Sequence, residues 1–431
     1  MNEACPDSYS LKDLLDMEKA ERRSSIHSFH RYFGKLIPAI PAFAIKHYTD
    51  PGDWVCDPFA GSGTTLVEAK LNGRNALGLE INPISCSIAR VKTTPLDNAL
   101  LQELNELLRR DIQADTLPVY GGEIPYCVNR GHWFKPFVQD DLVRIKRSID
   151  GFFTRHKSSL SYKEQESITN FYKMILSSII RNVSNADTRH VFPGYSKRLR
   201  QLDAEGKREI NVFNSFKKAL DKKTKAFREY ENKDAQIIVE NTDSRFFHAE
   251  DYPKARLIVT NPPYISSIRY IETLKLELYW MEYIFGSDGY KALERKMIGS
   301  DRLDRKEYSE PLLTPYQEIN DIAEKVYLQD AKSGNVVSRY FNEMADVIKN
   351  MSRLLLPGGH VVVKISDSKI KKIKIETGVF LTEIARLFGF EPLDCFPDKI
   401  GGRSLLTARN IYSDIITHDY IVVWRKRNSG Q

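Results

Sequence analysis

Two short apolar runs flank a glycine-rich turn and a helical stretch in the first part of the chain. Asp53–Asp57 is a run that leads into proline and glycine, as a buried strand does. Thr64–Asn72 has apolar residues at helical spacing, and Asn75–Glu80 is a second short strand that ends on an acid. The order of strand, glycine turn, helix, strand and acid predicts a βαβ unit.

A helical pattern replaces the strand pattern over residues 96–235. Amphipathic spacing predicts helices over Leu101–Ile112, Phe137–Phe153 and Ile168–Ile180, and a long, strongly charged helix over Lys207–Asn232. We interpret this region as a mostly helical insertion.

An α/β pattern returns after residue 236. We expect two helices, Tyr340–Leu356 and Gly378–Phe388, the first closed by a Pro-Gly-Gly stop signal. The predicted strands are Gln236–Val239, Leu257–Thr260, His360–Ile365 and His418–Arg425, of which the last is expected to close a sheet. The sequence thus divides into residues 1–95 and 236–431, two halves of one α/β domain, and the insertion 96–235 between them.

Composition narrows the class of protein only a little. The 431 residues are 42% hydrophobic and 11% aromatic, so the chain can bury a core and is not disordered by composition. None of the five cysteines has CxxC spacing, which suggests neither a zinc site nor a disulfide framework and fits a reducing cytoplasm. No apolar run is long enough for a signal peptide or a membrane span, so we expect a cytoplasmic protein with no membrane contact.

The segment Asp57–Thr65 is the first candidate site. Its glycines lie between a strand and a helix, where the backbone can approach a ligand and the helix N-terminus offers free N–H groups. No lysine follows the second glycine, so this is not a phosphate-binding Walker loop, and Leu66 occupies the third glycine position of the dinucleotide fingerprint. Glu80 ends the next strand, where a carboxylate can accept both hydroxyls of a ribose, and Asn82-Pro83 follows it.

The segment Thr260–Tyr264 (TNPPY) is the second candidate site, directly after a predicted strand. An amino group on an aromatic base is a poor nucleophile, because its lone pair is delocalised into the ring. A site that methylates such a group must accept hydrogen bonds from it and hold it toward the methyl donor. Asn261 and the Pro262 carbonyl are suitable acceptors, proline stiffens the loop, and Tyr264 offers a face on which a flipped base can stack.

DPFAGSGTTLVEA with GLEINP, followed by TNPPY, resembles the S-adenosylmethionine-dependent DNA amino-methyltransferases of restriction-modification systems. The resemblance covers residues 26–94 and 236–280 by specific motifs, and 340–425 by the order of strands and helices. It implies a Rossmann-like, seven-stranded methyltransferase sheet with a direct, metal-free transfer. It also implies double-stranded DNA as substrate and a cognate restriction endonuclease as partner. The implied catalytic residues are Asn261, Pro262, Pro263 and Tyr264.

The same resemblance assigns the cofactor site. His27–Pro38 resembles the segment that precedes the cofactor motif, so Lys35 or a nearby backbone N–H is expected at the cofactor carboxylate. Asp243 falls where the family places an acid near the adenine ring, although a turn or helix cap explains it equally well. The implied cofactor-binding residues are Lys35, Asp57, Pro58, Phe59, Ala60, Gly61, Ser62, Gly63, Thr64, Glu80, Asn82 and Asp243.

The modified base and the polymer stay open. Asn261 before Pro-Pro-Tyr resembles the adenine-N6 enzymes and favours adenine, whereas Thr260 resembles the TSPPY of cytosine-N4 enzymes. Methylation of RNA or of a protein glutamine uses a similar loop, usually closer behind the cofactor motif than here. A catalytically inactive DNA-binding protein is the remaining alternative, and the intact Glu80 and TNPPY motifs argue against it.

Basic residues concentrate in the insertion. Residues 197–228 hold eleven lysines and arginines against five acids, one of them just beyond at Glu229, within a chain of net charge +7. Such cations can neutralise phosphates, while side chains around Asn185–Tyr195 read base edges, although a solvated charged helix explains the run as well. The predicted DNA-binding residues are Lys197, Arg198, Arg200, Lys217, Lys218, Lys222 and Lys223.

Overall fold

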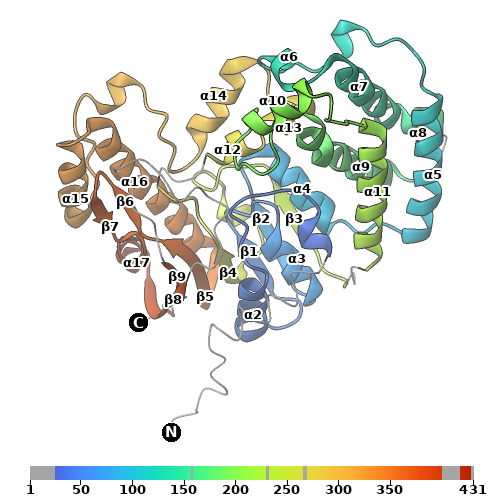
Figure 1. The fold of residues 1–431 in the computed structure, drawn as a ribbon. Helices are drawn as coiled ribbons and strands as arrows, with labels where there is room; N and C mark the ends of the chain where they lie inside the picture. Colours follow the sequence, from blue (N-terminus) through green and yellow to red (C-terminus); the bar gives the residue numbers. More distant parts are fainter. Residues whose placement is uncertain (1–24, 157–158, 230–232, 266–268, 400–417, 429–431) are drawn as a thin grey trace.

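The computed structural model of the chain is built around one seven-stranded sheet with the strand order β3-β2-β1-β4-β5-β9-β8 (Figure 1). It describes residues 25–156, 159–229, 233–265, 269–399 and 418–428. The strands are β1 (Trp54–Asp57), β2 (Asn75–Leu79), β3 (Ile237–Glu240), β4 (Ala255–Thr260), β5 (Leu355–Ser366), β8 (Phe390–Lys399) and β9 (His418–Lys426). The predicted α/β class and the seven-stranded Rossmann-like sheet are confirmed.

The sheet reverses its winding between β1 and β4. Strands β1, β2 and β3 pair in parallel on one side, and β1 pairs in parallel with β4 on the other, followed by β5. The carboxyl ends of these strands therefore meet at one edge, and a crevice forms where the strand order reverses. The segments that follow β1, β2 and β4 include both candidate sites.

Strand β9 does not close the sheet, contrary to the sequence-based expectation. It lies antiparallel between β5 and β8. Residues 421–424 are all buried, on both faces, which is typical of an inner strand. The edge is formed by β8, which sequence analysis missed, and its two prolines are tolerated because an edge strand has N–H groups that need no partner in the sheet.

Helices cover both faces of the sheet. Val55 and Val259 belong to the core under α2 (Ala39–Tyr48), α3 (Thr64–Leu71) and α4 (Pro83–Thr93). Their neighbours Cys56 and Ile258 point to the opposite face, which is packed against α16 (Ala331–Leu354) and α17 (Thr377–Leu387). Because both faces are buried, these strands are nearly continuous apolar runs rather than alternating ones.

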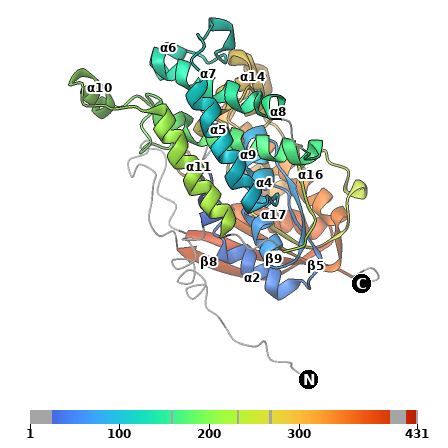
Figure 2. The ribbon, with the colours of Figure 1, turned by 90° about the vertical axis from the view of Figure 1, so that its right-hand side faces the viewer.

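A separate helical core lies beside the sheet (Figures 1 and 2). Trp280, which follows the TNPPY segment in the chain, is fully buried in this core, with its ring 5.3 Å from that of Phe134. The core thus joins the insertion to residues beyond the predicted boundary at 236. Its main helices are α5 (Asn98–Ala114), α7 (Pro136–Asp150), α9 (Tyr162–Val183), α11 (Val212–Arg228), α12 (Tyr270–Thr273) and α13 (Lys275–Trp280).

Several shorter elements complete the chain. The helix α10 (Lys197–Ala204) stands out from the other helices in Figure 2. The others are α6 (Arg130–Trp133), α8 (Phe152–Arg155), α14 (Gly286–Lys296), α15 (Gln317–Tyr327) and the hairpin of β6 (Ser368–Ile370) and β7 (Ile373–Ile375). No helix in the described part of the chain is long and apolar enough to cross a membrane.

Several predicted boundaries are wrong, most clearly those of the charged helix, of helix α16 and of strand β5. The charged helix predicted from Lys207 begins at Val212, because the Asn211 side chain accepts from the Asn214 N–H at 2.8 Å and caps it. Helix α16 begins at Ala331, well before the predicted start, and Asp330 caps it by accepting from the Ser333 N–H at 2.7 Å. The Pro-Gly-Gly stop signal is part of strand β5 itself.

Candidate functional site

A pocket opens where the segments after β1, β2 and β4 meet. Of the predicted residues, Asn261 and Pro263 of the TNPPY loop line it together with Asp243. Gly63, Asn82, Pro262 and Tyr264 do not line it. The predicted cofactor residues in its wall, besides Asp243, are Lys35, Asp57, Pro58, Phe59, Ala60, Gly61, Ser62, Thr64 and Glu80.

Glu80 holds the glycine loop in place. One carboxylate oxygen accepts from the Gly61 N–H and the other from the Asn82 N–H, both at 2.8 Å. Burial raises the pKa of Glu80 to about 7, although these two N–H groups act against the rise. Each oxygen keeps a second lone pair, so the carboxylate can still accept from ligand hydroxyls.

Asp57 connects the two candidate sites. Its carboxylate accepts from Thr260 Oγ1 at 2.7 Å, from Thr65 Oγ1 at 2.8 Å and from the Phe59 N–H at 3.0 Å. Burial raises the pKa of Asp57 to about 6. The residue therefore ties the end of β4, where the TNPPY segment begins, to the glycine loop. Thr65 and Thr260 lie within the two candidate segments, but their bonds to Asp57 were not predicted. Thr260 is 203 positions from Asp57, and nothing local in the sequence marks such a contact.

The two glycines of the loop serve different needs. Gly61 has φ = 51° and Gly63 has φ = 78°, a region that side chains other than glycine rarely adopt. A Cβ at Gly63 would lie 2.8 Å from that of Ala89, so this glycine also lets α3 approach α4 closely. Gly63 is needed for packing behind the loop, and Gly61 forms part of the wall.

Two lysines lie beside the glycine loop, Lys35 half-buried and Lys92 buried. Lys35 lines the pocket and donates to the carbonyl oxygens of His27 at 2.7 Å and His30 at 2.9 Å. Burial lowers the pKa of Lys35 to about 8. Lys92, which was not predicted, donates to the Ser62 carbonyl at 2.7 Å. The Lys35 ammonium keeps one of its three protons for a ligand.

Asn82 supports the site without lining it. Its side-chain oxygen accepts from the Ile84 N–H at 3.3 Å and caps α4, while its own backbone N–H is one of the two donors to Glu80. Asn82 thus positions Glu80, and its predicted role in binding the cofactor stays a prediction.

Asp243 belongs to an ion-pair network. Its carboxylate accepts from the Arg245 guanidinium, with Nε at 3.0 Å from Oδ1, and Arg245 also pairs with Glu343 and donates to the Lys296 carbonyl at 2.8 Å. Lys296 lines the pocket as well. Arg245, which sequence analysis missed, thus fixes two walls of the pocket relative to each other.

The amide of Asn261 has a defined orientation. Its Nδ2 donates to the Gly34 carbonyl at 3.0 Å, and its Oδ1 accepts from the Tyr264 hydroxyl at 3.1 Å. Burial raises the pKa of Tyr264. The tyrosines that line the pocket are Tyr32 and Tyr270, and Tyr264 is not among the lining residues. The stacking of a flipped base on Tyr264 therefore stays a prediction.

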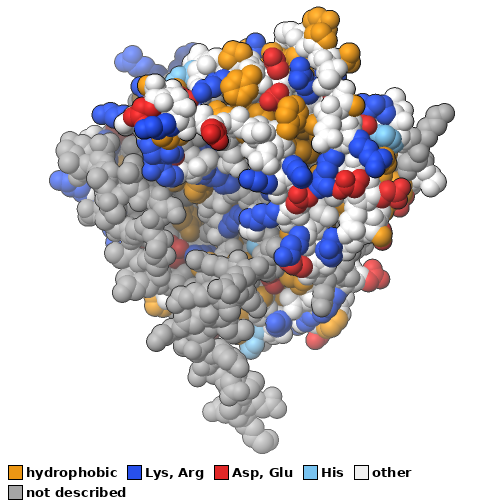
Figure 3. Space-filling model, turned by 45° about the vertical axis from the view of Figure 1, so that its right-hand side comes forward, with side chains coloured by type: hydrophobic (Ala, Val, Ile, Leu, Met, Phe, Trp, Pro, Cys, Tyr) orange, Lys and Arg blue, Asp and Glu red, His pale blue; other side chains and the backbone are white. Residues whose placement is uncertain are grey.

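The predicted DNA-binding residues fall into two groups. Six are exposed and one, Lys223, is buried. The exposed residues are Lys197, Arg198, Arg200, Lys217, Lys218 and Lys222, of which Arg198 also pairs with Asp187 at 3.3 Å. On the helical side of the molecule, Lys and Arg side chains form a band with acidic side chains among them (Figure 3).

Lys223 is buried, contrary to the prediction that it contacts DNA. It is only 9% exposed, and its Nζ lies 5.4 Å from the centre of the Phe29 ring. Its position continues the apolar stripe of Phe216, Leu220 and Phe227 along α11, so its side chain points into the helical core. Lys223 is not available to a phosphate.

Within the described residues, no cluster of three or more His, Cys, Asp or Glu side chains could hold a metal ion.

Comparisons with known proteins find a DNA methylase family and several type II methyltransferases. The model of a family described as DNA methylase matches residues 2–91. The chain is 23% identical to the type II methyltransferase M.MvaI of Kocuria varians over 91% of this chain and 88% of that protein. It is 22% identical to M.BsoBI of Geobacillus stearothermophilus over 95% and 87%, respectively. It is 39% identical to M.MjaII of Methanocaldococcus jannaschii, over 35% of this chain and 26% of that protein.

Proposed function

Because these comparisons confirm the resemblance of this chain to the S-adenosylmethionine-dependent DNA amino-methyltransferases, we propose that it methylates an exocyclic amino nitrogen at specific sites in double-stranded DNA. The favoured target is adenine N6. The observation that carries the proposal is the 2.7 Å bond from Thr260 to Asp57, which places Asn261 in the same pocket wall as Glu80.

The pocket fits the cofactor in its polar groups. Glu80 keeps free lone pairs for ribose hydroxyls, Lys35 keeps a proton for a carboxylate, and Asp243 keeps acceptor capacity for an adenine amino group. The buried hydroxyl of Ser62 lines the pocket and has no hydrogen-bond partner among the described residues. Such an orphaned group is stabilised when a ligand supplies a partner. When bound, S-adenosylmethionine supplies an electrophilic methyl group on a positively charged sulfur.

Asn261 orients the amino group of the base. The Gly34 carbonyl and the Tyr264 hydroxyl hold its amide in one orientation, and Oδ1 keeps a lone pair for an N–H of the base. The resemblance implies the Pro262 carbonyl as the second acceptor, although Pro262 does not line the pocket in this structure. Hydrogen bonds to both N–H groups hold the nitrogen toward the methyl donor, and no covalent bond to the protein is needed. The rate then depends mainly on positioning.

Thr260 bears on the choice between the two bases. Its resemblance to the TSPPY loop was the reason to consider cytosine N4. The Thr260 hydroxyl donates to Asp57 and therefore holds the two loops together. The residue has a structural use that is independent of the base, so we retain adenine as the favoured target and cytosine N4 as the alternative.

The test is incorporation of the methyl group from labelled cofactor into duplex DNA, RNA and protein, followed by mass spectrometry of the nucleosides. We expect label in duplex DNA as N6-methyladenine. N4-methylcytosine would change the base and keep the class of enzyme. Label in RNA or in a glutamine side chain, or cofactor binding without transfer to any DNA, would overturn the proposal. Protection of the methylated DNA against a co-encoded endonuclease would test the proposed partner.

A further inference from the structure

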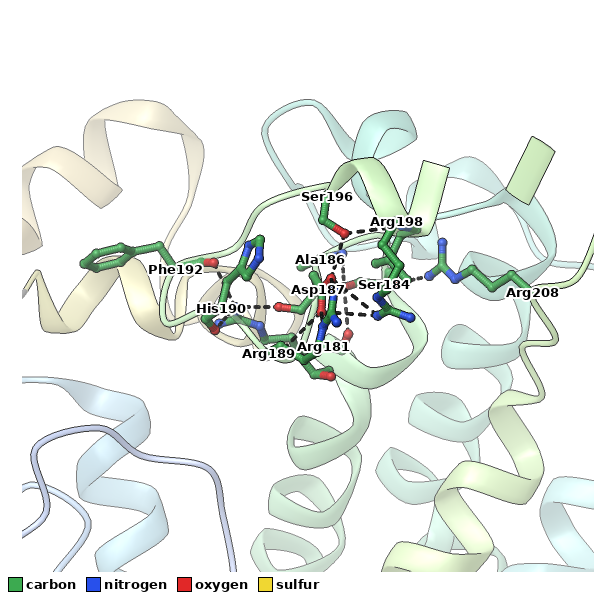
Figure 4. A network of polar contacts seen from close by, with 12 residues as sticks. Arg181, Ser184, Ala186, Asp187, Arg189, His190, Phe192, Ser196, Arg198 and Arg208 are labelled. Carbon is green, nitrogen blue, oxygen red and sulfur yellow. Dashed lines mark hydrogen bonds and ion pairs between the residues drawn. The ribbon is translucent and has the colours of Figure 1, made fainter. Parts of the chain in front are cut away.

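The loop that connects α9 to α10 is held from beneath by a buried arginine. Arg181 of α9 is 2% exposed. Its guanidinium donates to three successive carbonyl oxygens of this loop, those of His190 at 2.7 Å, Val191 at 2.9 Å and Phe192 at 2.8 Å (Figure 4). Three charge-assisted bonds from one rigid fork fix the path of the backbone.

The same loop is tied to the wall of the catalytic pocket. Arg31 donates to the carbonyl oxygens of Thr188 at 2.7 Å and His190 at 2.5 Å. The residue that follows it, Tyr32, lines the pocket. A base held in the pocket would therefore have its neighbours in the duplex near this loop.

Asp187 organises the outer side of the loop. Its carboxylate is fully buried and accepts from Ser196 Oγ at 2.6 Å and from Arg198 Nη2 at 3.3 Å. It also accepts from Arg189 through Nη2 at 3.0 Å and through Nε and the backbone N–H (Figure 4). These donors, Arg189 first, hold the pKa of Asp187 well below its usual range. The carboxylate stays ionised and keeps the Arg189 side chain in one orientation.

Arg189 is held on one edge and free on the other. Its side chain is 60% exposed although Nε and Nη2 face Asp187. Among the described residues Nη1 has no partner, and Nη2 keeps a second proton. A guanidinium fixed in this way presents two parallel donors to solvent. The rotamer entropy that a flexible arginine loses on binding is already lost in the free protein.

We propose that Arg189 reads a guanine of the recognition sequence through its O6 and N7 atoms in the major groove, next to the base that is methylated. The inference rests on the proposed function. Two parallel donors match these two acceptors of guanine and no other single base edge in the major groove. The adjacent Asp187 carboxylate offsets part of the positive charge, which weakens a contact to phosphate but preserves the directional fork.

The experiment compares methylation specificity in variants. The recognition sequence of the wild-type protein is first read from a plasmid library with randomised duplex segments. Arg189→Ala should then lower the preference for guanine at one position by about ten- to hundredfold, with the other positions unchanged. Arg189→Lys should lose the same preference, because an ammonium cannot bond both acceptors in a fixed plane. Cofactor affinity measured by calorimetry should stay the same.

Arg198→Ala is the matched control, since Arg198 pairs with the same carboxylate and its side chain is 43% exposed. It should weaken methylation of every sequence alike. If Arg189→Ala also lowers the methylation of all sequences alike, or leaves every preference for guanine intact, the inference is overturned while the proposed function stands. If Arg189→Ala does not fold, Arg189→Lys decides by the same criteria. A wild-type protein that methylates no DNA would overturn the proposed function and the inference with it.

Discussion

Replacing Glu80 with glutamine should weaken the binding of S-adenosylmethionine by about 10- to 150-fold. In the structure each carboxylate oxygen of Glu80 already accepts one backbone N–H, from Gly61 or Asn82, and retains one lone pair toward the pocket. A glutamine of the same shape turns one of these acceptors into a donor and removes the charge. Hydrogen bonds to a charged group contribute about 1.5–3 kcal/mol, which corresponds to that range of dissociation constants.

The pH dependence of cofactor binding provides a second test of the role of Glu80. Burial raises the pKa of Glu80 to about 7, and donors on a ribose stabilise only the ionised carboxylate. Protons therefore compete with the cofactor, and affinity is lost as pH falls. About a tenth of the free carboxyl groups are ionised one pH unit below the pKa, so the dissociation constant should rise about tenfold from pH 8 to pH 6.

Two other groups in the wall titrate near this window. Burial raises the pKa of Asp57 to about 6, so its protonation adds to the loss only at the acidic end. Burial lowers the pKa of Lys35 to about 8, so its ammonium is lost as pH rises above 8 and affinity for a carboxylate falls there instead. Between pH 6 and pH 7 the slope should therefore come mainly from Glu80.

Calorimetric titration with the cofactor at pH 6, 7 and 8 measures both effects. The wild-type protein should show the tenfold change, most of it between pH 6 and pH 7, and Glu80→Gln should bind weakly and with little slope between pH 6 and pH 7. Glu240→Gln, at the end of the neighbouring strand β3 and outside the pocket wall, is the matched control and should behave like the wild type. Equal affinity in Glu80→Gln and the wild type, or the same slope in both, would refute the role assigned to Glu80.

Three further predictions concern the catalytic loop and the helical region. Asn261→Ala should still bind the cofactor but transfer the methyl group at least about a hundredfold more slowly, a loss of roughly 3 kcal/mol of orientation; near-normal turnover would remove Asn261 from the mechanism. Charge reversal of the exposed lysines of α11, in the combined variant Lys217→Glu, Lys218→Glu and Lys222→Glu, should weaken DNA binding and flatten its dependence on salt. An unchanged salt slope would show that these lysines are only a solvated face. Lys223→Glu alone should lower the free energy of unfolding by about 3 kcal/mol or more in urea titrations, because it buries a carboxylate against Phe29, whereas Lys223→Met should fold normally. Equal stability of Lys223→Glu and Lys218→Glu would contradict the buried position of Lys223.

The unit β1–α3–β2 was predictable from sequence because its information is local. An apolar run specifies each strand, the glycines permit the positive φ angles of the turn, and helical spacing specifies α3. The cofactor motif lies within this unit, and Thr260–Tyr264 is also contiguous, so both candidate sites could be found as patterns. Helices α5, α7 and α9 followed from amphipathic spacing for the same reason.

Tertiary structure alone decided which distant groups meet. The bond from Thr260 to Asp57 joins residues 203 positions apart, and the pairing of Arg245 with Glu343 spans 98. The place of β9 inside the sheet, and the burial of Lys223 on a charged helix, also depend on which faces pack together. Local sequence specifies the periodicity of an element, whereas the partner of a side chain depends on how two elements are aligned in space. Sequence therefore determined the chemical groups available to this protein, and packing determined which of them share a pocket.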